Sequence, residues 1–372
     1  MFYAFVMISI SMCAYEILSL ILPLKFSIQT KILLSLILIS GLAKGFLFVR
    51  TPTGFDIYEL PYFIQLFISG AYNFIIVALF MLVIKDFIFV ACKVFRINFP
   101  THNASLFVLS LALCSTVYGT YEALKVPAVN THEIYIENLG KEFDGMKIAM
   151  LVDIHADTLT DKNFVEAVVN KTNALNPDLI LIPGDFVDGQ VKSQGKNLAP
   201  LKNLKSKFGV YGTTGNHEYY FDYEGWINEF PKLNVKILEN ENVIFTSGDS
   251  KLILAGVPDS TGGQMGLSAP NLKQALKGIP ENSPIILMDH RPSNARENAK
   301  FNISLQVSGH THGGQMPGIY YLVKRANKGF VRGWYDVEKM KLYVSPGTSQ
   351  WNGFCLRLFD PSEITLFILR TL

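Results

Sequence analysis

The first third of the chain is dominated by apolar segments long enough to cross a lipid bilayer. Residues 1–128 contain only 13 of the 64 charged side chains of the 372-residue sequence. A membrane-spanning helix needs about 20 mostly apolar residues, and four segments qualify, at about residues 2–24, 32–49, 62–84 and 104–121. The last two contain no charged residue. The sequence therefore predicts an all-α bundle of about four transmembrane helices over residues 1–125, and so an integral, multi-pass membrane protein.

Two charged residues interrupt the predicted helices. Lys44 lies near the end of the second segment, and its long side chain is expected to reach the membrane interface. Glu16 lies deeper in the first segment. It either pairs with a partner inside the bundle, which we favour, or marks a functional polar site. The first segment has neither a basic start nor a small-residue cleavage site, so a cleaved signal peptide is not expected.

The basic residues beside the predicted helices give an expected orientation. Lys25 and Lys31 lie in the first connection, and Lys85, Lys93 and Arg96 lie in the third. Loops rich in lysine and arginine face the cytoplasm. Both termini and the globular part of the chain are therefore expected to be extracytoplasmic, by a margin of only a few charges. The short apolar stretch 86–97 is expected to lie along the membrane interface.

The overall composition excludes two classes of protein. Hydrophobic residues make up 49% of the chain and charged residues 17%, the opposite of a disordered protein. The net charge of +2 is too small to indicate a nucleic-acid partner. The four cysteines do not have the spacing of a disulfide framework or a zinc ribbon. Nothing in the composition indicates the oligomeric state.

The remainder of the chain has the pattern of an α/β domain. Residues 129–140 are polar with few apolar anchors, so a linker is predicted at 126–140 and a globular domain at 141–372. Within this domain, short apolar strand-like segments alternate with helical segments, which predicts two packed mixed sheets flanked by helices. Helices are expected at about 160–175, 197–206, 222–230, 270–278 and 293–300, and the last strands at Gly353–Phe359 and Ile364–Leu369.

Polar residues of one chemical kind follow five of the predicted strands. They are Asp153 and His155, Asp185 and Asp188, Asn216 and His217, Asp289 and His290, and His310 and His312. Five of the seven histidines of the chain lie in these segments. Because ligand sites of α/β sheets form at the carboxyl ends of the strands, these side chains are expected to gather at one edge of the domain.

Asp, Asn and His side chains together are typical ligands of divalent metal ions. Two such ions about 3.5–4 Å apart can stabilise the attacking and leaving oxygens of a displacement at phosphorus, and they need a carboxylate between them. Asp185 is the best candidate, because Gly184 before it allows a tight turn at the end of the strand. Asn216 would be a neutral oxygen ligand that adds no negative charge opposite a phosphate.

The five segments, read as DIH, GDFVD, GNHE, the isolated His290 and GHTH, resemble the calcineurin-like metallophosphoesterase superfamily. The longer strings GNHEYY, DHRP and GHTHGGQ, with the residues Pro361–Thr365 near the end, resemble a subgroup of transmembrane proteins with a metallophosphoesterase domain. The resemblance covers about residues 140–372. It implies a four-layer α/β/β/α sandwich with two divalent metal ions, for which Mn, Fe and Zn all remain open.

The resemblance also implies a role for each matching residue. Asp185 would bridge the two ions, and His217 would protonate the leaving oxygen or stabilise its charge while a metal-held hydroxide attacks phosphorus. The implied ligands are Asp153, His155 and His312 for the first ion, and Asn216, His290 and His310 for the second. His217 could instead cap a helix or support a ligand, so its role stays open at this point.

Three further residues are expected to lie in or around the site. Asp188 is expected to support the site by hydrogen bonding to a ligand imidazole. Arg291, beside His290, either contacts a substrate phosphate or forms a surface ion pair. Asp157 departs from the pattern of many relatives and is expected to face water rather than to alter the charge around the site.

The combined expectation is a membrane-anchored phosphodiesterase or pyrophosphatase. Membrane attachment favours a lipid-linked phosphate ester, for example a UDP-diacylglucosamine-type compound, although that reaction faces the cytoplasm and conflicts with the expected orientation. One alternative is a membrane scaffold or sensor that retains the metals without turnover. Transport through the helices is disfavoured, because the apolar segments contain few paired ionisable residues.

Overall fold

The computed structural model describes residues 2–47, 60–351 and 353–372. The chain divides into two compact units. The first, called here the helical unit, comprises residues 1–123 together with 352–358. The second, the sheet unit, comprises residues 124–351 and 359–372. A short segment close to the end of the chain therefore belongs to the same unit as the N-terminal helices.

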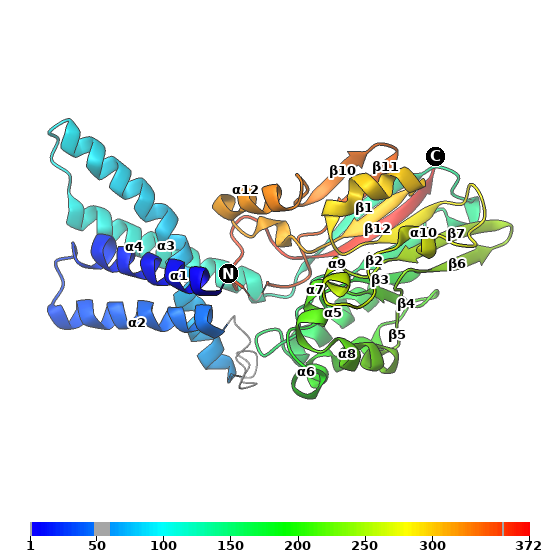
Figure 1. Cartoon of the computed structure of the whole chain (residues 1–372), viewed down its shortest axis with the longest axis horizontal. Coiled ribbons are helices and arrows are strands. Elements are labelled where there is room, and N and C mark those ends of the chain that lie inside the picture. The colour runs from blue at the N-terminus through cyan, green and yellow to red at the C-terminus, as the bar shows by residue number, and fades with distance from the viewer. Residues whose placement is uncertain (1, 48–59, 352) are drawn as a thin grey trace. The chain divides into compact units, whose positions relative to one another are not determined.

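The helical unit contains long helices in all four regions where apolar segments are predicted (Figure 1). The helices α3 and α4 are long and apolar enough to cross a membrane. A crossing by the whole bundle stays a prediction. The stretch 86–97, expected along the interface, instead begins as the last turns of α3, because no proline or glycine ends the helix before Val94. The bounds are α1 Phe2–Glu16 with a π-helical turn Ile17–Ile21, α2 Ile28–Leu47, α3 Tyr62–Val94 and α4 Thr101–Leu124.

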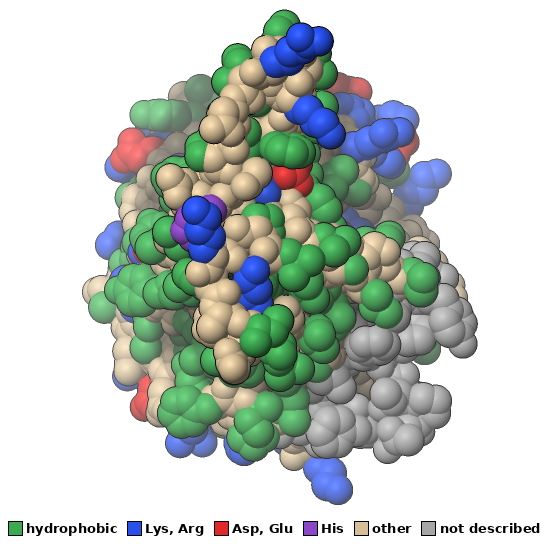
Figure 2. Space-filling view, turned by 90° about the vertical axis from the view of Figure 1, so that its left-hand side faces the viewer, with side chains coloured by type: hydrophobic (Ala, Val, Ile, Leu, Met, Phe, Trp, Pro, Cys, Tyr) green, Lys and Arg blue, Asp and Glu red, His purple; other side chains and the backbone are tan. Residues whose placement is uncertain are grey.

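Many apolar side chains of the helical unit have no protein neighbours covering them. Ile32 and Leu36 on α2, Phe87 on α3 and Phe107 on α4 are all more than half exposed. Figure 2 looks onto this unit and shows hydrophobic side chains over much of its face, with lysine and arginine side chains among them. Contiguous apolar surface of this kind is unfavourable in water and is expected where lipid covers it.

The inner polar residues of the helical unit differ in part from expectation. Lys44 does not extend toward an interface: it is 1% exposed, and its Nζ donates a 2.7 Å hydrogen bond to Ser69. The apolar surroundings make an internal partner more favourable than a long reach for the ammonium group. Glu16 is fully buried, and neither of its carboxylate oxygens has a hydrogen-bond partner among the described residues. Lys85 and Asp86 form an ion pair of 3.0 Å.

The segment 353–358 is not the strand that its alternating apolar residues predict. The backbone N–H of Arg357 donates to the carbonyl oxygen of Gly119 on α4 at 2.9 Å. The side-chain amide of Asn73 on α3 donates to the carbonyl oxygen of Cys355 at 2.6 Å. Because α3 and α4 take these backbone groups, the segment packs on helices and pairs with no neighbouring strand.

The sheet unit is a sandwich of two six-stranded sheets (Figure 1). The first has the order β1-β12-β2-β3-β4-β5 and the second β10-β11-β9-β8-β7-β6. Each combines parallel and antiparallel pairs, which confirms the predicted mixed sheets. The bounds are β1 Ala128–Ile136, β2 Lys147–Met150, β3 Leu179–Pro183, β4 Val210–Thr213, β5 Val235–Ile237, β6 Glu241–Ser247, β7 Ser250–Gly256, β8 Ile285–Met288, β9 Leu305–Ser308, β10 Gly333–Val337, β11 Met340–Val344 and β12 Glu363–Thr371.

Alternation along the central strands builds a core on both faces of each sheet. In β3, Leu179 and Leu181 lie in the core between the sheets, whereas Ile180 and Ile182 pack toward helices. The two-residue period of a strand makes this division, and a strand buried on both faces reads as the continuous apolar run seen here. The helices of this unit are α5 Lys162–Asn173, α6 Val191–Leu198, α7 Asn216–Phe221, α8 Tyr223–Glu229, α9 Ser260–Gln264, α10 Leu272–Ala275, α11 Ala295–Asn298 and α12 Pro317–Ala326.

Most of the predicted linker is a strand. Residues Ala128–Ile136 form β1, which pairs in parallel with β12 along its whole length. Only Ile134 and Ile136 of this strand are buried, because β1 is at the edge of its sheet and much of it faces solvent. That position explains the polar sequence that suggested a linker. Residues 125–127 are all that separate α4 from β1.

Candidate metal centre

The loops that follow β2, β3, β4, β8 and β9 bring the predicted ligands together in the sheet unit. Three sets of side chains offer ligand atoms that all lie within 4.8 Å of one another. They are Asp153, His155 and His312; Asp185, His290 and His310; and His155, Asp185 and His217. The predicted ligands therefore converge from loops that are up to about 160 residues apart in the chain.

Asp185 lies between the two outer sets. Its Oδ2 is 3.6 Å from Nε2 of His155 and 3.2 Å from Nε2 of His290. The carboxylate is 2% exposed, so water does not screen it well. One carboxylate oxygen thus faces an imidazole nitrogen from each half of the site, which is the arrangement expected of a bridging ligand.

The imidazole tautomers direct nitrogen lone pairs into the same space. Nδ1 of His155 is 3.0 Å from a carboxylate oxygen of Asp188, and Nδ1 of His290 is 2.8 Å from the carbonyl oxygen of Pro183. Both oxygens can only accept, so each Nδ1 carries a proton, and each ring in its neutral form would keep a lone pair at Nε2 for a metal ion. Nε2 of His155 then faces Nε2 of His312 at 3.1 Å, a contact that a cation between the rings would relieve.

A neutral oxygen is also left without a partner here. Oδ1 of Asn216 is buried, and no hydrogen bond reaches it from the described residues. A buried acceptor without a partner costs about 1–3 kcal/mol, and a divalent cation would satisfy it. The orphaned amide oxygen, the converging imidazole nitrogens and the shared carboxylate all fit a metal site of Asp, Asn and His ligands.

The buried carboxylates create a strong negative field. Burial disfavours the charged form of His155, but the charges of Asp188, Asp185 and Asp153 outweigh it and raise its pKa to about 9. Burial also opposes protonation of His290, yet Asp185 and Asp153 raise its pKa to about 10. A field that favours positive charge on two buried imidazoles is one that divalent cations would neutralise.

The backbone at the site is held in an uncommon conformation. Asp153, His155, Asp185, His310 and His312 all have positive φ, between 43° and 71°. Positive φ is uncommon for any residue except glycine, although aspartate and histidine adopt it more often than most, and the cost is of order 1–3 kcal/mol each. Strain concentrated in the ligand loops is typical of a functional site, because the surrounding fold must hold each side chain in a direction the loop alone would not favour.

Glu218 holds the loop that carries Asp185. Its carboxylate accepts hydrogen bonds from the backbone N–H groups of Asp185 at 3.1 Å, Phe186 at 2.8 Å and Gly215 at 2.7 Å. A side chain added at Gly215 would lie 2.2 Å from Oδ1 of Asp185, so glycine is required there for the two loops to approach. No sequence pattern singled out Glu218. Its carboxylate accepts from the backbone N–H of Gly215 at the start of α7, as the glutamate of a capping box does, but glycine has no side chain to complete the motif.

Asp188 connects His155 to His217. Its Oδ1 accepts a hydrogen bond from Nδ1 of each ring. His217 has Nε2 3.9 Å from Oδ2 of Asp185, and its side chain is 11% exposed, more than those of His155 and His290. One carboxylate thus orients a predicted ligand and the predicted proton donor together.

Arg291 is adjacent to the site but is not free to move. Its Nε donates to Asp259 at 2.6 Å and its Nη2 to the hydroxyl of Thr261 at 3.1 Å. Its Nη1 is 3.3 Å from Nε2 of His310. The ion pair is partly buried rather than on the open surface, since the Asp259 side chain is 0% exposed and that of Arg291 is 24% exposed.

Asp157 does not face water as expected. It is 0% exposed, and its Oδ1 accepts hydrogen bonds from the backbone N–H groups of Leu159 and Thr160, both at 2.7 Å. The short side chain closes a turn of its own loop, which is a common role of aspartate. The departure from the usual sequence therefore has a local structural reason.

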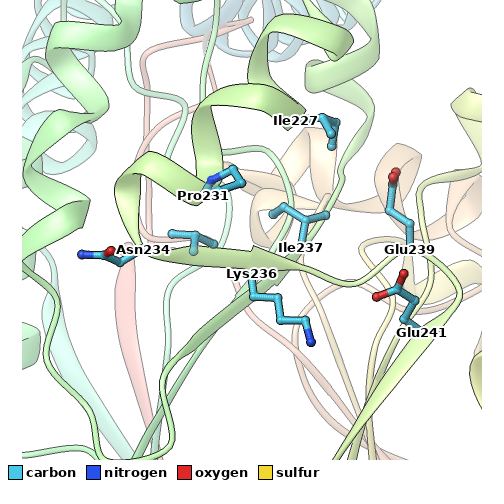
Figure 3. A pocket seen from close by; sticks show the side chains of 8 residues that line it. Ile227, Pro231, Asn234, Lys236, Ile237, Glu239 and Glu241 are labelled. Carbon is cyan, nitrogen blue, oxygen red and sulfur yellow. The ribbon is translucent and has the colours of Figure 1, made fainter.

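A pocket of about 440 Å³ lies elsewhere on the sheet unit, at the edge strand β5 (Figure 3). Lys236, Glu239 and Glu241 supply its charged groups. The other lining residues are Ile227 on α8, Pro231 and Asn234 in the turn that follows, and Val235 and Ile237 on β5. None of the predicted metal ligands lines it. It offers no cluster comparable to the one beside Asp185.

Comparison with known proteins agrees with the geometry. Residues 146–314 match the calcineurin-like phosphoesterase family. The chain is 36% identical over 299 residues to an uncharacterized metallophosphoesterase of Campylobacter jejuni, with 78% of each chain covered. It is 33% identical over 274 residues to a transmembrane protein with metallophosphoesterase domain of Danio rerio, which covers 71% of this chain and 62% of the relative. A protein of the same description from Bos taurus is 36% identical over 267 residues, covering 68% of this chain and 60% of that one. The chain therefore belongs to the calcineurin-like metallophosphoesterases and is a metal-dependent hydrolase of phosphoester bonds.

Proposed function

We propose that the chain hydrolyses a phosphodiester or pyrophosphate bond at a site for two divalent metal ions. The observation that carries the proposal is the position of Asp185, whose Oδ2 faces imidazole nitrogens of both halves of the cluster at 3.6 and 3.2 Å. Mn, Fe and Zn all suit the donor set. The proposed ligands are Asp153, His155 and His312 for one ion, Asn216, His290 and His310 for the other, and Asp185 for both.

The ions, when bound, would polarise the phosphoryl group and supply positive charge to the oxygens of an in-line displacement. The proposed task of the surrounding chain is to fix their ligands in place. Glu218 holds the Asp185 loop through three backbone N–H groups. Asp188 orients the ring of His155. The glycine at 215 leaves room for the Asp185 carboxylate.

His217 is the proposed proton donor to the leaving oxygen. Burial disfavours its protonated form, but the negative charges of Asp185 and Asp188 outweigh burial and raise its pKa. Its Nδ1 is occupied by Asp188, so Nε2 is the atom that can give up a proton. The partial exposure of the ring supports a role in contact with substrate rather than inside the ligand set.

Membrane attachment and a lipid-linked substrate form the finer part of the proposal. The long apolar helices α3 and α4 support an anchor in the bilayer, and relatives are described as transmembrane proteins. The basic residues of the first and third connections favour a multi-pass arrangement with the site outside the cytoplasm. A lipid-linked phosphoester on that side of the membrane is the proposed substrate class. A UDP-diacylglucosamine-type substrate requires the opposite orientation, which a reporter fused to the C-terminus would reveal.

Removal of the metal ions is expected to abolish turnover reversibly. Full-length protein in detergent is treated with a chelator, dialysed, and assayed with bis(p-nitrophenyl) phosphate before and after addition of Mn²⁺, Fe²⁺ or Zn²⁺. Metal analysis of the restored protein should give about two ions per chain. Undiminished hydrolysis by the metal-free protein would contradict the proposal, as would silence with every ion tested. The scaffold alternative predicts restored metal content without restored hydrolysis.

Arg291 is the proposed contact to a non-bridging phosphate oxygen. Replacement by glutamine is expected to lower kcat/KM roughly 10- to 100-fold, because a charge-assisted hydrogen bond contributes about 1.5–3 kcal/mol. Arg296→Gln is the matched control, since that guanidinium lies over the ring of Phe330 and touches no predicted ligand. Steady-state kinetics and metal analysis check the result together. An unchanged kcat/KM, or a loss of bound metal that accounts for the whole effect, would show that Arg291 only supports His310.

A further inference from the structure

The helix α12 presents an unusual surface next to the metal centre. It begins at Pro317, five residues after the predicted ligand His312, and none of its ten residues is buried. Tyr321 is 72% exposed and Leu322 68%. The helix lies at the surface of the sheet unit (Figure 1). A short helix that stays in place without a buried residue needs an explanation beyond packing, because burial normally supplies most of a helix's stability.

The apolar residues of α12 differ in their exposure. Ile319, Leu322, Val323 and Ala326 have the spacing of one apolar stripe along a helix. Ile319 and Val323 are partly buried, whereas Leu322 and Ala326 are exposed, and Leu322 is among the more exposed apolar residues of the domain. The outer edge of the stripe is thus available to another surface.

Basic side chains predominate around the end of α12, where Lys328 also interacts electrostatically with the exposed carboxylate of Glu297. No acidic residue occurs between Glu297 and Asp336 in the sequence. Within that stretch, Lys324 and Arg325 in the last turn of α12 and Lys328 just after it are exposed. Aliphatic and aromatic side chains flanked by exposed cations are the composition of helices that lie on a membrane surface. The same surface would attract an anionic partner of any kind, but the apolar stripe selects one with a hydrocarbon interior.

A second exposed apolar residue is connected to the segments on either side of the helix. Phe359 is 80% exposed and has a φ of 65°, a strained conformation for an aromatic residue. Its carbonyl oxygen accepts a hydrogen bond from Arg332, and Asp360 beside it pairs with the same arginine. Asp360 also lies against Gly313, where an added side chain would collide with its carboxylate, so this corner is tied to the base of α12.

Phe359 also has a distinctive place along the chain. It is the first residue of the sheet unit after the segment that belongs to the helical unit. At the other junction, residues 125–127 separate α4 from β1. Phe359 is therefore a residue at one of the chain junctions between the two units.

We propose that α12 and Phe359 form a surface that binds a bilayer containing anionic phospholipid. Leu322 and its apolar neighbours enter the interface, and Lys324, Arg325 and Lys328 contact the lipid phosphates. The loop that carries His310 and His312 leads directly into this helix. Membrane binding at α12 therefore fixes the metal centre at the lipid surface. The inference concerns binding alone and does not depend on turnover.

Hydrogen–deuterium exchange of the full-length protein tests this. The protein is placed in nanodiscs of phosphatidylcholine with or without 30% phosphatidylglycerol, and exchange is followed in the peptide covering residues 316–328. Exchange of this peptide is expected to be about tenfold slower in the anionic discs, because each cation near such a surface adds to binding. Leu322→Glu and the double change Lys324→Glu with Arg325→Glu should each remove the protection.

Ile244→Glu on β6 is the control, since it adds the same charge at an exposed apolar residue that lies outside α12. It should leave the protection of α12 intact. If Leu322→Glu lowers the melting temperature, the double charge reversal, which changes only exposed side chains, decides the question. Equal exchange in the two kinds of disc, or protection that survives the charge reversal, overturns the proposal. Protection in detergent by an added protein fraction but not by lipid would assign the surface to a protein partner and overturn it as well.

Discussion

Replacing Asp185 with asparagine is expected to disrupt both halves of the metal centre at once. The amide keeps the shape of the carboxylate but loses its charge, and the oxygen facing His155 and His290 would no longer join two ions. We expect metal content to fall from about two ions per chain to one or none. Turnover should fall on the order of 10³-fold, since loss of one transition-state charge contact costs about 4 kcal/mol.

The control for Asp185→Asn is Asp161→Asn. Asp161 caps the first turn of α5 by accepting from Asn163 and Phe164, and asparagine caps equally well. The measurements are metal analysis by mass spectrometry, the melting temperature and hydrolysis of bis(p-nitrophenyl) phosphate. A variant that keeps both ions and most of its activity would show that Asp185 is not shared between them. The melting temperature of the metal-free variant is compared with those of metal-free wild type and metal-free Asp161→Asn. A lower value for the Asp185 variant alone would indicate a defect in folding rather than in metal binding.

Replacing His217 with alanine is expected to separate metal binding from turnover. The ring contributes a proton donor but no proposed ligand atom, so both ions should stay bound. General acid catalysis typically contributes 10²–10⁴-fold, and kcat should fall on the order of 10³-fold with an ester whose leaving group needs a proton. The decrease in kcat should be smaller with bis(p-nitrophenyl) phosphate than with diphenyl phosphate, because p-nitrophenolate leaves readily without protonation.

The leaving-group comparison distinguishes the possible roles of His217. A proton donor gives a loss that grows as the leaving group becomes more basic. A residue that only stabilises charge on phosphorus gives the same loss with every ester. His132→Ala is the matched control, because that ring lies on β1 against Tyr343 and Trp334, with no predicted ligand among those contacts. Equal losses in the two esters would fit charge stabilisation, and loss of an ion would make His217 a ligand.

The candidate site could largely be predicted from the sequence because its signals are local. Each predicted ligand follows an apolar strand within a few residues, and the carboxyl ends of parallel strands meet at one edge of a sheet. The order of the strands and of the polar segments that follow them therefore predicts, from the sequence alone, that Asp153, Asp185 and Asn216 lie near one another. The same local pattern predicted two mixed sheets with helices against them, which the structure confirms.

The residues that support the site could not be predicted in this way. Arg291 is fixed by Asp259, 32 residues earlier, and Asp185 is fixed by Glu218, 33 residues later. Such partners become neighbours only when the tertiary fold brings separate loops into contact. A single carboxylate in a loop gives no signal of which backbone N–H groups it will meet.

Sequence alone determined the elements whose pattern is complete within a few residues: the apolar helices, the buried strands and the candidate ligands at their ends. The tertiary structure decided the rest. The polar segment Ala128–Ile136 forms the edge strand β1 because it pairs in parallel with β12. The tertiary structure placed 353–358 on α3 and α4 because Asn73 and Gly119 took up its backbone groups. It left Leu322 of α12 exposed, because none of the ten residues of this helix is fully buried against the sheet unit. In each case the outcome depends on which surface lies opposite, and a linear pattern does not contain that information.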